Sequence, residues 1–136
     1  MKKLVLLLAV WSAGAAQAQP PPVPAACAHA GAQAAYQSGL QYRNGAGVAR
    51  DAALALRWFS KAAHCQVPAA MFLLSNMLAA GEGAPADAAA ALRWLQEAAA
   101  LGYPAALQQL ALSEPDPRKA DLLMRQAAHA LQHPPM

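Results

Sequence analysis

The chain has 136 residues, of which 57% are hydrophobic and 12% charged, and its formal net charge is +3. Lys2 and Lys3 supply two of its ten basic residues, so removal of an N-terminal leader would leave eight basic against seven acidic residues, a charge of +1. Such a balance offers no electrostatic footprint for nucleic acid or an anionic membrane. Much of the hydrophobic share is alanine, which forms helices well but buries little area, so we expect closely packed helices around a thin core.

The first eighteen residues have the features of a secretory signal peptide. Lys2 and Lys3 precede the apolar run LVLLLAVW, and small residues follow as far as Ala18. This order predicts cleavage after Ala18 and a periplasmic or secreted protein. No later stretch is long and apolar enough to span a membrane, so no membrane insertion is expected after cleavage. The segment QPPPVPAA separates the apolar run from Cys27, which argues against a lipid-modified cysteine.

A Pro-rich lead-in, residues 19–24, follows the leader and is expected to be extended. The rest of the chain shows helical patterns and lacks alternating β-branched stretches. A first helix is predicted to end near Arg43, because Gly45 can take the left-handed conformation that terminates helices. A second helix is predicted over 52–64, where the Asp51 carboxylate can accept hydrogen bonds from the free N–H groups of the first turn.

The same plan occurs again 36 residues further along. Pro68 is expected to open a third helix that continues over 69–80, since a missing N–H costs nothing in a first turn. A glycine-rich loop follows, and Asp87 is placed to cap a fourth helix over 88–101. The chain therefore repeats a unit of two helices joined by a glycine loop.

A third and shorter unit completes the pattern. Pro104 precedes a predicted fifth helix over about 105–112, after which the glycine loop is missing. A final helix is predicted over about 118–131, reached by a connection seven residues shorter than the earlier ones. Terminal repeats of solenoids are commonly atypical because they cap the stack.

Two stretches show the period directly, LRWFSKAA at 56–63 and LRWLQEAA at 92–99. A fixed period of this length predicts stacked supersecondary units. The fold class predicted is all-α, an α/α superhelical solenoid of about two and a half to three helix-turn-helix repeats. Within a repeat domain of residues 25–136, the units are predicted at about 30–66, 67–102 and 103–131.

Packing between these helices is predicted from residue size. Small side chains let two helices approach closely, and we expect this at Ala34, Gly39, Ala55 and Ala62. Large side chains should fill the space between units, and those predicted are Trp58 and Trp94, surrounded by Leu54, Leu56 and Leu92.

The order and spacing of these residues resemble the SEL-one-like repeat, a relative of the tetratricopeptide repeat. The first copy carries Ala34, Gly39, Tyr42, Gly45, Gly47, Val48, Asp51, Ala55, Leu56, Trp58, Phe59, Lys61, Ala62 and Ala63. The second carries Ala70, Leu74, Gly81, Gly83, Asp87, Ala91, Leu92, Trp94, Ala98, Ala99 and Gly102. Departures include Gln66 and Ser75, where the family prefers glycine.

This resemblance covers about residues 34–112 and is specific for the fold. It implies a right-handed α/α superhelix whose members mostly bind proteins or peptides, often as adaptors. Secreted bacterial relatives include cysteine-rich proteins with disulfides that tie helices together, and β-lactam binding or hydrolysis has been proposed for some of them. Fold alone carries none of these functions to the present chain.

Two cysteines in an exported chain favour a disulfide. If the first hairpin turns near Ala46 and Gly47, Cys27 and Cys65 face each other at its open end. We therefore predict a Cys27–Cys65 disulfide, with two unpaired buried thiols as the alternative.

The sequence predicts no enzyme, cofactor or metal site. It has no Ser-x-x-Lys, Gly-x-Ser-x-Gly, Cys-x-x-Cys or His-Glu-x-x-His motif. His129 and His133 have the spacing of a helical metal pair, but Pro134 follows at once, so an ordinary surface or core role is favoured. Asp51 and Asp87 lie one repeat apart, which favours capping over paired-carboxylate chemistry.

A partner-binding face is predicted from the resemblance, because the first helix of each unit lines the concave face in related superhelices. Alignment on Gly39 places there Tyr36, Leu40, Arg43 and Asn44 from the first unit, Phe72 and Asn76 from the second, and Gln108 and Leu112 from the third. Aromatic rings beside an arginine and amides suit an extended or helical segment of a protein. The alternative is that Tyr36, Phe72 and Leu112 pack inside the units.

These observations favour an exported, non-catalytic scaffold or adaptor that binds a protein or peptide. Three alternatives remain open at the level of sequence. The first is an immunity-type protein that masks a toxin at the cell envelope, and the second an enzyme or binder in cell-wall or β-lactam chemistry. The third is a structural fragment that self-associates by stacking end to end.

Overall fold

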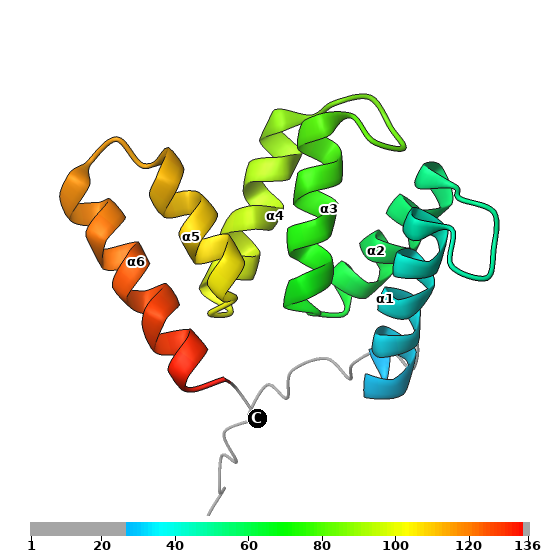
Figure 1. The fold of residues 1–136 in the computed structure, drawn as a ribbon, viewed down its shortest axis with the longest axis horizontal. Coiled ribbons are helices and arrows are strands. Elements are labelled where there is room, and N and C mark those ends of the chain that lie inside the picture. Colours follow the sequence, from blue (N-terminus) through cyan, green and yellow to red (C-terminus); the bar gives the residue numbers. More distant parts are fainter. Residues whose placement is uncertain (1–26, 135–136) are drawn as a thin grey trace, which may run out of the picture.

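The computed structural model describes residues 27–134, so the predicted leader and Pro-rich lead-in lie outside the described residues. Within this range the chain forms six α-helices and no strand, which confirms the all-α class (Figure 1). The helices are α1 (His29–Asn44), α2 (Ala52–His64), α3 (Pro68–Ala80), α4 (Ala88–Ala100), α5 (Pro104–Ser113) and α6 (Pro117–Gln132).

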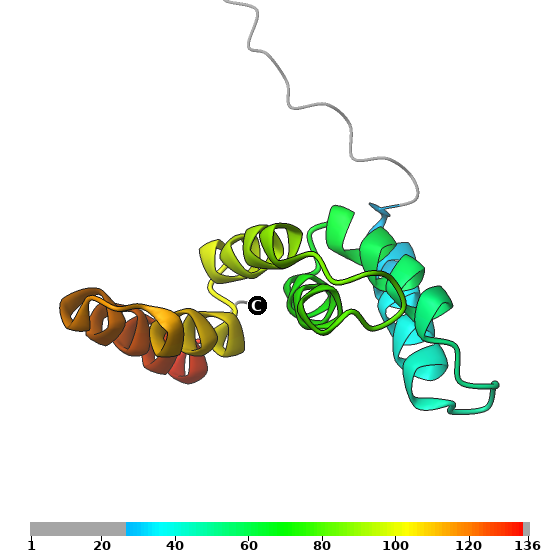
Figure 2. The same ribbon diagram turned by 90° about the horizontal axis from the view of Figure 1, so that it is seen from above.

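Consecutive helices pair into three hairpins, α1–α2, α3–α4 and α5–α6, and the hairpins pack on one another through α2–α3 and α4–α5. They form a single curved row, as expected for a solenoid (Figures 1 and 2). The α2–α3 and α4–α5 turns, the start of α1 and the end of α6 lie along one edge, the lower edge in Figure 1. The three loops that join the helices within each hairpin lie along the opposite edge.

The helix ends follow from local side chains. The Asp51 carboxylate accepts a hydrogen bond from the Leu54 N–H at 2.9 Å, and Asp87 accepts from the Ala90 N–H at the same distance. Both aspartates precede the first helical residue, so each satisfies a donor that has no partner within the helix. Gly45 ends α1 in the left-handed conformation, with φ of 69°. The predicted capping roles are confirmed.

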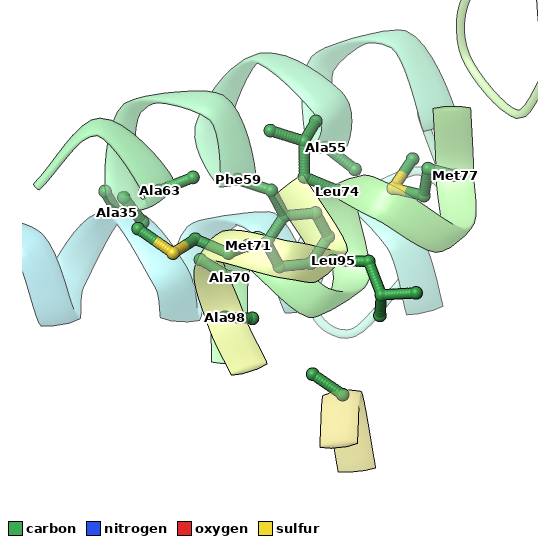
Figure 3. Close-up of a cluster of buried hydrophobic side chains, with 12 residues drawn as sticks. Ala35, Ala55, Phe59, Ala63, Ala70, Met71, Leu74, Met77, Leu95 and Ala98 are labelled. Carbon is green, nitrogen blue, oxygen red and sulfur yellow. The ribbon is translucent and has the colours of Figure 1, made fainter. Parts of the chain in front are cut away.

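The core lies between the first two hairpins and is built largely from alanine, with a few larger side chains from α2 and α3 (Figure 3). Phe59 is completely buried, and Met71, Leu74 and Met77 of α3 are nearly so. Gly39, Ala55 and Ala62 are buried as predicted, whereas Ala34 is exposed and its neighbour Ala35 is buried instead.

The prediction that the tryptophans fill the space between units is right only in part. Trp58 and Trp94 are half-buried at the margin of the core, and the fully covered positions are the next ones along each helix, Phe59 and Leu95. Adjacent residues project about 100° apart around a helix, so only one of each pair can point into the core. Trp94 does meet the preceding unit, because its ring lies edge-on to that of His64 at 5.1 Å. Leu92, expected beside it, is 48% exposed.

The contact between α1 and α2 depends on a glycine. A Cβ atom on Gly39 would come within 2.6 Å of the Phe59 ring, so no larger residue fits without a shift. One period later, Ser75 and Leu95 occupy the equivalent positions, and the buried Ser75 hydroxyl donates to the Ala91 carbonyl at 2.7 Å. The departure from glycine at Ser75 is therefore accompanied by a smaller partner side chain.

The turn between α2 and α3 contains the only non-glycine residue with positive φ in the described part of the chain, Gln66 at 64°. Its counterpart in the next unit is Gly102, with φ of 77°. A side chain in this conformation crowds the backbone, which is why glycine is preferred there. Gln66 stands where the family prefers glycine, and its left-handed backbone conformation is therefore strained.

Replacing Gly39 with alanine should lower the free energy of unfolding by about 1–3 kcal/mol, because the added methyl group collides with the Phe59 ring. The second variant Phe59→Leu should make the alanine less harmful, so the double variant should be more stable than the two separate losses predict. Urea unfolding followed by circular dichroism measures all three variants. Gln37→Ala, on the exposed side of α1, is the matched control and should change little. If the stability loss of the double variant equals the sum of the two single losses, the size of residue 39 is not matched to that of residue 59.

Replacing Gln66 with glycine should raise the free energy of unfolding by about 0.5–1 kcal/mol, since the left-handed strain is larger than the added entropy of the unfolded chain. The reciprocal change Gly102→Gln should destabilise the protein. No atom lies within 4 Å of a Cβ built at Gly102, so this variant isolates the backbone effect. Thermal unfolding gives both values, and a loss of stability in Gln66→Gly would show that its side chain matters more than its backbone.

Candidate partner-binding face

Three partly exposed aromatic rings, one from each unit, lie in or directly before the first helices of the hairpins. Phe72 of α3 lies 5.5 Å from Tyr103, the residue that precedes α5, measured between ring centroids. Tyr36 of α1 lies 6.0 Å from Phe59 in the core. Burial raises the pKa of the Tyr36 hydroxyl, and the negative charge that Tyr103 carries when ionised raises it further. We call Tyr36, Phe72 and Tyr103 the aromatic row.

Each ring of the aromatic row packs against the core and keeps part of its surface exposed. One side of the Tyr36 ring and of the Phe72 ring therefore packs inside the units, as the alternative predicts, while the other side stays open. The alternative does not describe Leu112, which is 80% exposed. The row provides a partly open apolar surface that crosses the boundaries between units.

Polar and aliphatic groups continue this surface along α1, α3 and α5. The Gln109 Nε2 atom donates to the Asn76 Oδ1 atom at 3.2 Å, which joins α5 to α3. Leu40 is half-buried against the core, whereas Gln108 is exposed. The first helices thus carry both amide groups and apolar side chains beside the aromatic row.

A charged cluster lies beside the loops at the opposite edge. Arg43 binds Glu82 through two contacts, Nε to Oε1 at 3.4 Å and Nη2 to Oε2 at 3.3 Å. The Arg50 Nη2 atom lies 3.8 Å from the same carboxylate. Together with the exposed Asn44, these side chains line a hollow of about 380 Å³. Two guanidinium groups share one carboxylate, so the cluster carries a net positive charge.

The loop between α3 and α4 explains how Glu82 reaches this position. Gly83 has φ of 83°, and a Cβ atom there would collide with the carbonyl of Ala52. Its loop therefore packs directly on the start of α2, in the preceding unit. This contact places Glu82 within reach of Arg43 and Arg50.

The predicted partner-binding residues all lie in α1, α3 or α5. Their role in binding stays a prediction. Sequence reasoning missed four neighbours of this face, namely Tyr103, Gln109, Arg50 and Glu82. Tyr103 could have been found as an aromatic residue directly before the helix-opening Pro104. Glu82 could have been found as the acidic residue in a glycine loop whose counterpart in the first unit is Ala46.

The Cys27–Cys65 disulfide is confirmed, with the two Cα atoms 5.0 Å apart. It joins the start of the first hairpin to the residue that ends α2, across 38 positions of sequence. The bond therefore ties α1 to α2 at the lower edge of the solenoid, next to the strained Gln66. Unpaired thiols, the alternative, are absent from residues 27–134.

The His129 and His133 rings lie 4.9 Å apart near the end of α6. Across residues 27–134, no group of three or more His, Cys, Asp or Glu side chains could hold a metal ion. None of the helices in this range combines the length and apolar character needed to cross a membrane.

Stacked helical hairpins of this kind define an α/α repeat solenoid. A family model described as the Sel1 repeat matches residues 32–66 and 68–103, which is more than half of the chain. The chain therefore belongs to the Sel1 repeat family, and the resemblance to SEL-one-like repeats is confirmed. Proteins with this fold commonly act as scaffolds for protein interaction and are generally non-catalytic.

Two solved structures show the same fold. A Sel1 repeat protein from Oxalobacter formigenes is 27% identical with a TM-score of 0.70, over 72% of this chain and 43% of that one. A protective antigen present in uropathogenic Escherichia coli strains, which displays an SLR fold, is 30% identical with a TM-score of 0.68, over 74% of this chain and 23% of that one. The present chain thus spans less than half of the first relative and about a quarter of the second. No curated protein matches it significantly.

Removing the disulfide should lower the free energy of unfolding by about 3–4 kcal/mol, because the bond restricts a long loop in the unfolded chain. The variant Cys27→Ser/Cys65→Ser tests this by urea unfolding. A reductant should bring the unmodified protein to the stability of the variant and leave the variant itself unchanged. Two titratable thiols in the oxidised, denatured protein would show that the bond does not form.

Proposed function

We propose that the protein is an exported, non-catalytic scaffold or adaptor that binds a protein or peptide segment through the face formed by α1, α3 and α5. The observation that carries this proposal is the aromatic row, in which Tyr36, Phe72 and Tyr103 keep part of their surface open while the core fixes their positions. Rings that are already held in place lose little conformational freedom when a partner binds. They are therefore suitable anchors for apolar side chains.

Two kinds of polar group lie beside the row: amides that can bind the backbone of a segment, and arginines that can bind an acidic side chain. Asn76 and Gln109 hold each other through one hydrogen bond, and each amide has further donors or acceptors to offer. The positive cluster of Arg43 and Arg50 around Glu82 favours an acidic group in the partner. A segment with apolar residues at one end and an acidic residue at the other would match this order.

Export is supported by two independent features of the chain. Residues 1–18 have the order of charge, apolar run and small residues typical of a signal peptide. The Cys27–Cys65 disulfide is consistent with an oxidising compartment, where such bonds persist. Both features support our proposal that the protein acts in the periplasm or outside the cell.

Affinity capture from the native envelope followed by calorimetry on the captured protein tests the proposed face. Tyr103→Ala and Arg43→Ala should each weaken binding by about tenfold or more, as expected for anchor residues. Arg57→Ala, an exposed arginine of α2, is the matched control for charge and should leave the affinity unchanged. Circular dichroism must show unaltered helicity in all three variants.

Two results would contradict the proposal. Equal loss of affinity in Arg57→Ala and Arg43→Ala would show that the partner binds elsewhere. Hydrolysis of nitrocefin by the purified protein, lost in a Tyr36→Ala/Arg43→Ala double variant, would favour the enzymatic alternative over a binding function alone.

A further inference from the structure

The α2–α3 turn, the α4–α5 turn and the end of α6 lie along the lower edge of the solenoid (Figure 1). Residues from these three segments line an apolar groove. Its walls include Val67 and Pro68 of the α2–α3 turn, Leu101, Tyr103 and Pro104 around the α4–α5 turn, and Leu131 of α6. The groove has a volume of about 370 Å³, and its lining is almost entirely apolar. Leu101 and Leu131 are 41% and 62% exposed, so two large apolar side chains of one patch face solvent. We call it the turn groove.

The disulfide holds Cys27, the first described residue, in a hollow next to the turn groove. Cys27 is bonded to Cys65, which is two residues before Val67. A neighbouring hollow is lined by both cysteines and shares Val67 and Pro68 with the turn groove. Whatever precedes Cys27 is therefore tethered beside this apolar surface.

We propose that residues 19–24, QPPPVP, bind in the turn groove of the same molecule as a polyproline II segment. The groove shares Tyr103 with the face of α1, α3 and α5, but this inference does not rest on the partner proposed for that face. Polyproline II advances about 3.1 Å per residue, so the residues from 19 to 26 reach roughly 25 Å from Cys27. Val67 is two residues beyond Cys65, whose Cα atom lies 5.0 Å from that of Cys27, so the segment is long enough to reach past Val67.

The chemistry of the groove selects a proline-rich occupant. An ordinary extended peptide would place backbone N–H groups against a wall that offers few acceptors, and unpaired buried donors are unfavourable. Four of the six residues in QPPPVP are prolines, which have no N–H to satisfy. Proline-rich segments also dock in aromatic-lined grooves with little loss of entropy, and Tyr103 supplies the aromatic ring here.

The tether favours this segment over a second copy of the chain or a separate partner. A short linker holds its ligand at an effective concentration in the millimolar range, so a weak contact is enough to fill the site. The same residues supplied by another molecule would have to reach that concentration in solution. The segment attached through Cys27 therefore has the advantage.

Nuclear magnetic resonance on the protein purified after export provides the test. We expect nuclear Overhauser contacts between the δ protons of Pro20–Pro24 and both the Tyr103 ring and the Leu131 methyl groups. The variant Pro20→Ser/Pro21→Ser/Pro22→Ser/Pro24→Ser keeps the length of the segment and should lose these contacts, with shifts in the Leu101 and Tyr103 signals. Absence of the contacts, together with identical groove signals in the variant, would overturn the proposal.

Two leucines of α6 form a matched pair of controls. Leu131 lines the turn groove and Leu122 does not, although Leu122 is similarly exposed at 56%. Leu131→Ser should weaken the contacts of the proline segment, whereas Leu122→Ser should leave them intact. Equal effects of the two variants would contradict binding in the groove.

Dilution and mixing identify other occupants. Contacts within one molecule should be unchanged over about a hundredfold range of protein concentration, because no association step is involved. Contacts that appear only at high concentration, or between differently labelled molecules in a mixed sample, would assign the groove to a second copy. Groove signals that respond only to added envelope protein would assign it to a partner, and either result would overturn the proposal.

Discussion

The structure depends on how closely the two helices of each hairpin approach. The chain has few large apolar residues to bury, so its helices must pack at short range through alanine and glycine. The contact of Gly39 with the Phe59 ring shows how little tolerance this leaves, since even one methyl group would collide. Close packing of this kind makes residue size at the contact more restrictive than hydrophobicity. The pair Ser75 and Leu95 shows a second way to fill the same position.

A thin core also explains why constraints outside the core matter in this protein. The first hairpin is held by a covalent bond at the lower edge, between Cys27 and Cys65. At the other edge, Glu82 of the second unit joins Arg43 and Arg50 of the first. Small domains with little buried area commonly need such additional links to be stable. Here the links lie at opposite edges of the first two hairpins, and neither reaches the third.

Much of the fold could be predicted because the signals are local and occur twice. Asp51 and Asp87 mark helix starts, and glycine or proline marks the turns, so the boundaries of α2 and α3 follow from neighbouring residues. The disulfide could also be predicted, since an antiparallel hairpin places Cys27 opposite Cys65. Choosing between adjacent bulky residues was harder. Trp58 and Phe59 both fit a core pattern, and only the rotation of α2 against its neighbours decides that Phe59 is buried.

The candidate site was less accessible to sequence reasoning, because it is formed between units. The repeat pattern located the first helices and thus Tyr36 and Phe72, which lie one period apart. It could not show that Tyr103 reaches back to Phe72, or that a loop of the second unit brings Glu82 to Arg43. Those contacts depend on the angle between successive hairpins. A period in the sequence specifies which residues are equivalent but contains no information about that angle.

The unequal junctions between hairpins have a mechanical consequence. Ion pairs of Arg43 and Arg50 with Glu82 join the first hairpin to the second. Within residues 27–134, no ion pair joins the second hairpin to the third. The side-chain contacts there are uncharged, namely the hydrogen bond between Asn76 and Gln109 and the ring contact between Phe72 and Tyr103. Bending of the arch should therefore be concentrated between α4 and α5, with the first two hairpins moving as one stiff body. A ligand that spans all three units would therefore meet a rigid surface on the first two hairpins and an adjustable surface on the third.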